Sequence, residues 1–251
     1  MVGINSNISP FESLNIIRFS SIDSTNLEAK RQIKSGAKMP MLIIADGQTN
    51  GRGRLGRTFY SPTSTGLYMT YVYKLFGDIS DNLCVTALAA VAVCSSIERL
   101  SGKSPLIKWV NDIYIDGKKV AGILTEAVID NDGNTFVIIG IGVNITTEDF
   151  PLEISDIATS VGDVDRDRLA FLIAKNLAEL ISALPDKTFM DYYRERSFVL
   201  GKEVQFTYNG VMEYGTAIAV DDNGALKIEL ENSTKRLLKT GEITLRLKKN
   251  P

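Results

Sequence analysis

Apolar residues in the first 150 positions fall into several short runs and one long run, separated by glycine-rich or polar turns. Runs of about four to eight apolar residues bounded by turn residues are typical of buried strands, whereas a longer run favours a helix. The pattern therefore predicts a helix at 82–100. It predicts strands at 41–45, 67–73, 106–109, 113–115, 120–128 and 136–143.

Polar residues predict where other helices begin and end. The segment 23–26 (Asp-Ser-Thr-Asn) is typical of a helix start, because Thr25 and Glu28 have the spacing of a capping box. Gly36 favours the end of that helix. Two further helices are expected at about 166–184 and 191–197.

The pattern changes after Gly201, where short strands alternate with the turns Asn209-Gly210 and Asn223-Gly224 and no helical period remains. Closely spaced hairpins of this kind predict a small β-barrel or sandwich. We therefore expect an α+β protein with a mixed β-sheet and flanking helices at residues 1–198. A separate β domain is expected at residues 199–251.

The composition excludes whole classes of catalytic site, because the 251 residues contain no histidine. Ser-His-Asp and Cys-His relays, imidazole-ligated zinc and a histidine general base are therefore impossible. Any chemistry must depend on carboxylates, lysine, arginine, backbone amides or a metal with oxygen ligands.

Charge and cysteine content narrow the setting. A net charge of −2 and a pI near 5.4 argue against a dedicated nucleic-acid or membrane-surface binder. The N-terminus has neither the basic nor the apolar region of a signal peptide. Cys84 and Cys94 lie about 15 Å apart on one predicted helix, too far for a disulfide. A cytoplasmic location is the simplest interpretation.

The segment 51–57 (Gly-Arg-Gly-Arg-Leu-Gly-Arg) is the sharpest local feature. From residue 48 to residue 77 no side chain is acidic, whereas Arg52, Arg54, Arg57 and Lys74 supply positive charge. Glycine lets backbone approach a ligand closely, and guanidinium groups bind phosphate or carboxylate through paired hydrogen bonds. The interpretation is a mobile loop that closes on a phosphorylated ligand. The alternatives are a disordered RNA-binding segment and a glycine-rich loop without function.

Two more segments combine polar and small residues. Residues 108–112 (Lys-Trp-Val-Asn-Asp) end a strand, and the next strand begins with Lys118 and Lys119. Because side chains alternate along a strand, one of these lysines is expected to face a pocket, on the side of Val120 or of Ala121. An Asx turn and two solvated lysines are the alternative. Glycines at 140–142 leave one strand face bare, which makes room for a flat ligand or weakens the strand.

Together and in this order, these segments resemble the biotin protein ligases over essentially the whole chain. Each block is weak alone, but the ordered set is highly specific. The resemblance implies a catalytic domain like that of class II aminoacyl-tRNA synthetases at 1–198 and an SH3-like β-barrel at 199–251. The matching segments are 24–26, Gln48, 51–57, 108–112, 118–124, 140–144 and 241–246.

The resemblance also implies a site, with Arg54 at the acyl-phosphate end and Lys119 reaching the biotin carboxylate and the α-phosphate. Phe59 is expected to stack on adenine, where the family often has tryptophan, and Val110 replaces the family's usual proline. The implied biotin contacts are Ser24, Thr25, Asn26, Gln48, Arg52, Gly53, Arg54, Lys119, Gly122 and Gly140. The implied nucleotide contacts are Arg54, Arg57, Phe59, Asn111, Lys119, Asn144 and Arg246.

The activity implied by the resemblance is ligation of biotin to a protein. The biotin carboxylate attacks the α-phosphorus of ATP to give biotinyl-5'-AMP, and a lysine of a biotin carboxyl carrier protein then displaces AMP. Mg²⁺ is expected as cofactor, with metal ligands left open. Arg54, Lys119 and Asp112 are the expected catalytic residues, with Asp112 orienting or deprotonating the incoming lysine.

Family members that also repress transcription carry an N-terminal winged helix. The Ser-Thr-Asn block begins here at residue 24, so no DNA-binding role is expected. Dimers are common in the family, but no feature of the sequence specifies a homodimer interface. The alternatives are a lipoate–protein ligase of the same fold, whose histidine-containing block is absent, and a non-catalytic binding module.

Overall fold

Two β-sheets and four α-helices make up the part of the chain that the computed structural model describes, residues 14–75, 82–239 and 246–247. The helices are α1 (Thr25–Lys34), α2 (Asn82–Ser101), α3 (Arg166–Ala183) and α4 (Phe189–Glu195), with a short 3₁₀ turn at Arg54–Gly56. The strands are β1 (Asn15–Phe19), β2 (Met41–Ala45), β3 (Gly66–Lys74), β4 (Leu106–Lys108), β5 (Asp112–Ile115), β6 (Lys118–Ile129), β7 (Thr135–Asn144), β8 (Glu203–Tyr208), β9 (Val211–Val220), β10 (Leu226–Glu229), β11 (Lys235–Leu238) and β12 (Arg246–Leu247).

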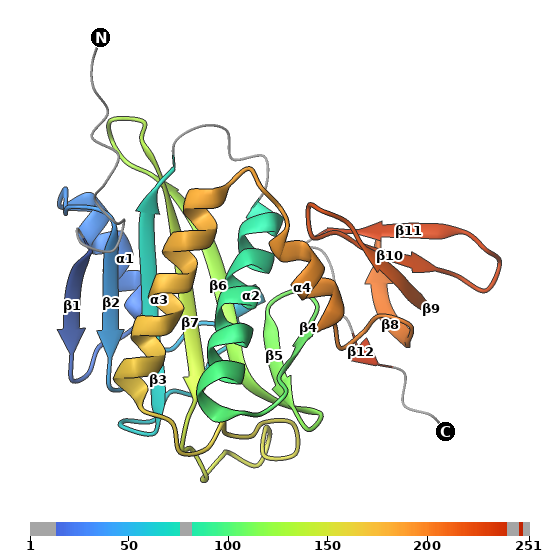
Figure 1. The fold of residues 1–251 in the computed structure, drawn as a ribbon, viewed down its shortest axis with the longest axis horizontal. Helices are drawn as coiled ribbons and strands as arrows, with labels where there is room; N and C mark the ends of the chain where they lie inside the picture. The colour runs from blue at the N-terminus through green and yellow to red at the C-terminus, as the bar shows by residue number, and fades with distance from the viewer. Residues whose placement is uncertain (1–13, 76–81, 240–245, 248–251) are drawn as a thin grey trace.

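The larger sheet has seven strands in the order β1-β2-β3-β7-β6-β5-β4. Strands β1 and β2 run parallel, and the other neighbouring pairs are antiparallel. Figure 1 shows α2 and α3 side by side on one face of this sheet and α1 on the other. The mixed sheet with flanking helices confirms the expected fold class.

Alternation along β7 decides what lies on each face of the sheet. Val137, Ile139 and Ile141 join the large core under α2 and α3. Phe136 and Ile138 point the other way, into a smaller core under α1. Gly140 and Gly142 continue that second face beyond the end of the small core. Gly140 lies beside Asn26 of α1, and Gly142 lies beside the ring of Phe59. The bare face predicted from the glycines therefore opens beside the α1 N-terminus.

Helix α2 is the one helix, among the described residues, that is long and apolar enough to cross a membrane. In the structure it packs against α3, β6 and α4, and 72% of the segment Cys84–Ser101 is buried. Both cysteines are buried and unbridged, as their spacing predicted. The apolar composition of α2 is that of a core helix.

The smaller sheet is antiparallel, with the order β11-β10-β9-β8-β12. Figure 1 shows it beside α4, at the β4 edge of the larger sheet. Its inward side chains, such as Val204, Phe206 and Leu226, belong to the same apolar cluster as α2 and α3. The second sheet is thus packed against the first unit, and the boundary at residues 198 and 199 stays a prediction.

At the N-terminal end one strand was missed and one local expectation was wrong. Strand β1 was not predicted, because its alternating pattern leaves Ile16 half-exposed and spans only five residues. The capping box does not form, because Ser24 is the N-cap and Thr25 is already helical. The Thr25 hydroxyl instead donates to Gln48, and the Glu28 carboxylate accepts from Arg31 and Gln32.

Substitution of Leu88 by alanine tests the role of α2 as a core element. Leu88 is fully buried, so Leu88→Ala is expected to lower the free energy of unfolding in urea by about 2–5 kcal/mol. The matched control is Leu152→Ala, where the side chain is 90% exposed and a change within about 0.5 kcal/mol is expected. Equal effects of the two substitutions would contradict the core assignment.

Candidate active site

A cavity opens where the N-terminus of α1, the bare face of β6 and β7 and the loop after β2 meet. The space between its walls totals about 460 Å³, including the open mouth. Every residue for which the family resemblance implied a biotin contact lines this one cavity. The lining residues are Ser24, Thr25, Asn26, Gln48, Arg52, Gly53, Arg54, Phe59, Asn111, Lys119, Gly122, Ile123, Leu124, Gly140, Ile141 and Gly142.

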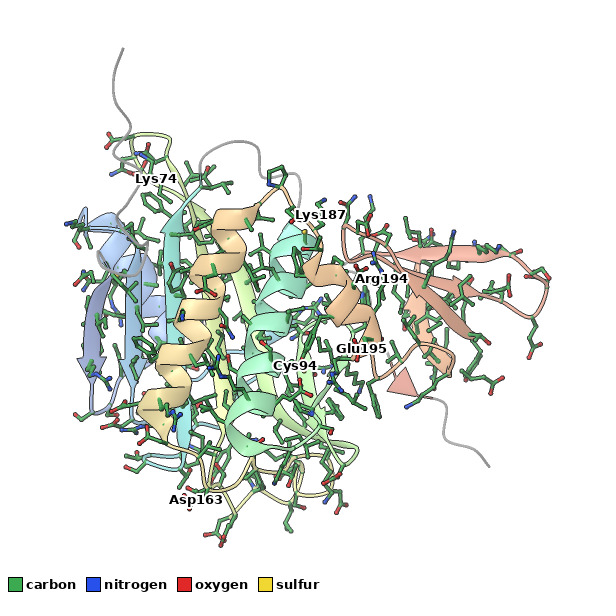
Figure 2. The ribbon with its side chains drawn as sticks, viewed as in Figure 1. Lys74, Cys94, Asp163, Lys187, Arg194 and Glu195 are labelled. Atoms are coloured by element: carbon green, nitrogen blue, oxygen red, sulfur yellow. The ribbon has the colours of Figure 1, made fainter. Side chains whose placement is uncertain are left out.

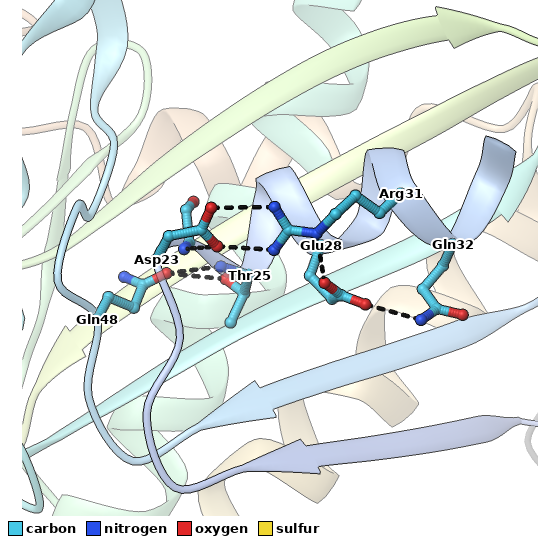
Figure 3. Close-up of polar contacts among 7 residues, drawn as sticks. Asp23, Thr25, Glu28, Arg31, Gln32 and Gln48 are labelled. Carbon is cyan, nitrogen blue, oxygen red and sulfur yellow. Dashed lines mark hydrogen bonds and ion pairs between the residues drawn. The ribbon is translucent and has the colours of Figure 1, made fainter. Parts of the chain in front are cut away.

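Gln48 is held in place by the start of α1. Its Oε1 accepts from the backbone N–H of Thr25 at 2.8 Å and from the Thr25 hydroxyl at 3.1 Å, as Figure 3 shows. Its Nε2 donates to the hydroxyl of Ser61 at 3.1 Å. The amide is therefore fixed at the wall of the cavity, and Ser61 is a supporting residue that sequence reasoning missed.

Asp23 fixes the entry of the chain into α1. Its carboxylate accepts two hydrogen bonds from the guanidinium of Arg31, at 3.0 and 2.7 Å, and one from the backbone N–H of Ser24 (Figure 3). The Arg31 hydrogen bonds are the main reason that the pKa of Asp23 lies below its usual value. The Asp23–Arg31 pair therefore fixes the position of the chain just before Ser24, Thr25 and Asn26, which line the cavity.

Asn26 is the most completely bonded polar residue of the cavity. The hydroxyl of the fully buried Thr70 donates to its Oδ1 at 2.7 Å, and its Nδ2 donates to Glu126 at 2.9 Å. Glu126 is paired in turn with Lys30, with 2.7 Å between Nζ and Oε1. Sequence reasoning missed Thr70 and Glu126, because only the register of β3, β6 and β7 brings them beneath α1.

The glycines of β7 allow this close packing. A Cβ added at Gly140 would lie 2.1 Å from Asn26 Oδ1, and one at Gly142 would lie 2.4 Å from Cε1 of Phe59. The ring of Phe59 therefore rests on the glycine face, edge-on to Tyr68 with 6.5 Å between centroids. Its stacking on adenine stays a prediction.

The segment Gly51–Thr58 forms a narrow hairpin-like loop. The backbone N–H of Gly53 donates to the carbonyl of Arg57 at 2.7 Å, and Arg52 bridges Thr58. Arg57 is exposed on the outside, whereas Arg54 turns inward and its NH1 donates to Asn111 Oδ1 at 3.0 Å. Burial lowers the pKa of Arg54, and the negative charge of Asp112 opposes this effect.

The turn before β5 places an amide and a carboxylate opposite two cations. Asn111 accepts from Arg54 and donates through Nδ2 to the carbonyl of Ile123 at 2.9 Å. Asp112 forms an ion pair with Lys119, at 2.7 Å between Oδ1 and Nζ. The Trp109–Val110 peptide bond in this turn is cis, at the position where the resemblance had suggested proline.

Lys119 does not lie on the face of β6 that strict alternation of side chains would give it. A register shift between β5 and β6 leaves Val120 without a partner, so Val120 and Ala121 both enter the core. Lys119 consequently shares a face with Gly122, whose added Cβ would lie 3.1 Å from Lys119 Nζ. Bulges commonly re-aim side chains in this way. Lys118 is exposed and contacts the carbonyl of Ser155.

A second cavity adjoins the first at Arg54, Phe59 and Lys119. It is walled by the outer part of the arginine loop and by the turn with Asn111 and Asp112. The predicted nucleotide contacts Arg57 and Phe59 belong to its lining. The arrangement suits an elongated ligand with a polar head at α1 and an anionic group between Arg54 and Lys119.

Asn144 lines neither of the two cavities. Asn144 is buried, and its Nδ2 donates to the carbonyl of Thr159 at 3.2 Å, so it ties β7 to the following loop. The side chain of Arg246 lies outside the described residues. Lys74 lies at the opposite end of β3 from Gly66, so the cations of the acid-free window do not form one cluster.

Comparison with known families and proteins gives a consistent result. Residues 18–144 match the model of the biotin/lipoate A/B protein ligase family, and residues 199–246 match the biotin protein ligase C-terminal domain. The chain is 34% identical over 230 residues to a bifunctional ligase/repressor of Bacillus spizizenii, covering 86% of this chain and 70% of that protein. It is 30% identical over 226 residues to the biotin–[acetyl-CoA-carboxylase] ligase of Mycobacterium tuberculosis, covering 84% and 82%.

Solved structures agree with this similarity. The biotin protein ligase of Aquifex aeolicus in complex with biotin and ATP superposes with a TM-score of 0.79 at 28% identity. The match covers 93% of this chain and 99% of that protein. Similarity therefore extends over both sheets and includes the strands that build the cavity.

Substitution of Gly140 by alanine tests the close packing of α1 on β7. The added methyl group would displace Asn26 from Thr70 and Glu126, so we expect Gly140→Ala to lower the free energy of unfolding by about 1–3 kcal/mol. Gly122→Ala is the comparison, because its nearest neighbours are the flexible end of Lys119 and the edge of Phe59. Chemical denaturation measures both, and a smaller loss for Gly140→Ala than for Gly122→Ala would contradict the packing account.

Proposed function

Because the chain belongs to the biotin protein ligase family, we propose that it activates biotin with ATP and transfers it to a lysine of a biotin carboxyl carrier protein. The observation that carries the proposal is the convergence of all the expected biotin contacts on one cavity that ends at Arg54 and Lys119. The ligase of Aquifex aeolicus, which binds biotin and ATP, supports the assignment of the two ligands.

The cavity has the chemistry that biotin requires. Thr25, Asn26 and Gln48 line the cavity and offer hydroxyl and amide groups to the polar fused-ring head of biotin. The bare glycine face of β7 accommodates a flat group, and the carboxylate of the side chain would then approach Lys119 and Arg54. The adjoining cavity, with Arg57 on its wall, would hold the nucleotide.

The first step brings two anionic groups together. A carboxylate oxygen of biotin attacks the α-phosphorus of ATP, the bond from that phosphorus to the bridging oxygen breaks, and pyrophosphate leaves. The main requirements are neutralisation and alignment, which the guanidinium of Arg54 and the ammonium of Lys119 supply without an imidazole. Asp112 and Asn111 hold these two cations before the substrates arrive.

Mg²⁺ is part of the proposal as an ion that arrives with the nucleotide. Among the residues that the structure describes, no group of three or more His, Cys, Asp or Glu side chains could hold a metal. Mg²⁺ bound to nucleotides commonly uses phosphate oxygens, water and one or two carboxylates, and Asp112 is the carboxylate available in the second cavity. When bound, the ion would neutralise phosphate charge.

The second step needs an uncharged amine. The carrier lysine attacks the acyl carbon of biotinyl-5'-AMP, the bond between that carbon and the phosphate oxygen breaks, and AMP leaves while the amine loses a proton. Asp112 is the proposed group for orienting or deprotonating the amine, since its carboxylate lies at the end of the cavity beside Lys119. The nucleotide roles of Asn144 and Arg246 stay predictions.

The broader setting also belongs to the proposal. A cytoplasmic location, a homodimer and a division into domains at residues 198 and 199 stay predictions, as does the lack of a DNA-binding repressor role. A lipoate–protein ligase remains the alternative substrate assignment, because the matching family model covers both kinds of ligase.

Exchange of labelled pyrophosphate into ATP tests the function directly. We expect exchange that depends on biotin and on Mg²⁺ and does not occur with lipoate. Exchange with lipoate alone would replace the substrate assignment, and no exchange with either acid would support a non-catalytic binding module instead.

The neighbouring lysines of β6 provide a matched pair of variants. Lys119→Ala is expected to slow biotin-dependent exchange by about 100-fold or more, because one cation is lost from the transition state. Lys118→Ala should leave exchange nearly unchanged, since Lys118 is exposed, lines neither cavity and donates from its ammonium group to the carbonyl of Ser155. Circular dichroism melting checks that both variants are folded. Similar exchange rates for the two variants would remove Lys119 from the site.

A further inference from the structure

The turn that carries Asn111 and Asp112 forms hydrogen bonds, on its side away from the cavity, with residues that follow α3 in the chain. The turn itself contributes one partner to Arg54 and one to Lys119. Its other side faces α4 and the smaller sheet, and neither of these elements lines the first cavity. Side chains in α4 could therefore influence the site without touching a substrate.

Tyr193, in α4, makes the central contact. It is fully buried, and its hydroxyl donates to the carbonyl of Val110 at 3.2 Å, immediately before Asn111. Burial is the main cause that raises the pKa of Tyr193, and the charge of Asp112 adds to it. The phenol therefore stays neutral and able to donate over the working pH range. A hydrogen bond made by a buried group of this kind is expensive to lose.

The same turn is bonded from the smaller sheet. The indole N–H of Trp109 donates to the carbonyl of Gly224 at 2.8 Å. Gly224 lies in the turn between β9 and β10, and Arg194 bonds the carbonyl of Val220 at 2.9 Å at the start of that turn. Figure 2 shows Arg194 on α4 at the boundary with the smaller sheet. Consecutive residues of α4 thus contact the turn and the small sheet.

We infer that Tyr193 is a positioning residue for the ligase reaction, acting through the carbonyl of Val110 on the placement of Asn111 and Asp112. The inference rests on the proposed function and adds to it a residue outside both cavities. A shift of the turn would separate Arg54 and Lys119 from their partners and misalign both cations.

Tyr192 provides a matched control on the same helix. Its hydroxyl donates to Glu98 of α2 at 2.7 Å and makes no contact with the turn. Tyr192→Phe and Tyr193→Phe therefore delete the same atom from neighbouring residues. Tyr192→Phe removes the hydrogen bonds to Glu98 and to the thiol of Cys94, whereas Tyr193→Phe removes the bond to Val110. Only the Val110 bond leads to the turn before Asp112.

The test measures kcat and KM for biotin-dependent pyrophosphate exchange in the full chain. Tyr193→Phe is expected to lower kcat by about 10- to 100-fold, because small displacements of aligned groups are costly. Its KM for biotin should change less than kcat, since the proposed ring contacts Thr25, Asn26 and Gln48 are untouched and only the carboxylate contacts are affected. Tyr192→Phe should keep kcat within about twofold of the unsubstituted chain. Equal kcat values for the two variants would overturn the inference.

A second variant and a double-mutant cycle separate positioning from simple loss of folding. Trp109→Phe keeps an aromatic ring but removes the bond to Gly224, and it is expected to lower kcat in the same way even if Tyr193→Phe fails to fold. Because Trp109 also lines the second cavity, KM for ATP is measured too and is expected to change less than kcat. A change in KM for ATP with kcat unaltered would contradict the inference. In an Asn111→Ala background, Tyr193→Phe should add less than about a threefold further loss, because both act through one turn. Full additivity would contradict the inference. If the unsubstituted chain shows no exchange, the proposed function fails instead.

Discussion

The close approach of α1 and the arginine loop to the glycine face of β7 is the constraint on which the rest of the site depends. A side chain at Gly140 would occupy the position of Asn26, and one at Gly142 would occupy the position of Phe59. With that face bare, the start of α1 reaches the sheet and Gln48 binds its first backbone N–H. The cavity is therefore built from main-chain geometry, and the amides of Asn26 and Gln48 on its wall are oriented by hydrogen bonds within the protein.

The positive charges of the site are concentrated at one place on the cavity wall. The chain has no histidine and a net charge of only −2, yet Arg54 and Lys119 lie together at the junction of two cavities. Each cation is held by a side chain of one turn, Asn111 or Asp112. Activation of a carboxylate by a nucleotide needs oriented positive charge more than a proton relay, and this arrangement supplies it.

Much of the fold was predictable because hydrophobic period and turn residues are local properties of the sequence. What escaped prediction depended on long-range register. Thr25 bonds Gln48 across the chain and leaves the capping box unformed, and the bulge at Val120 turns Lys119 towards Gly122. Lys74 and Asn144 belong to sequence segments that also contain site residues. In the structure Lys74 lies at the far end of β3, and Asn144 is buried.

A structure of the chain with biotin and a non-hydrolysable ATP analogue would show where both ligands bind. We expect the fused ring of biotin beside Thr25 and Gln48, and its carboxylate within hydrogen-bond distance of Lys119. We also expect the α-phosphate between Lys119 and Arg54, with Asn111 and Asp112 still forming the turn. Biotin bound away from the glycine face, or a phosphate that contacts neither cation, would contradict the proposed site.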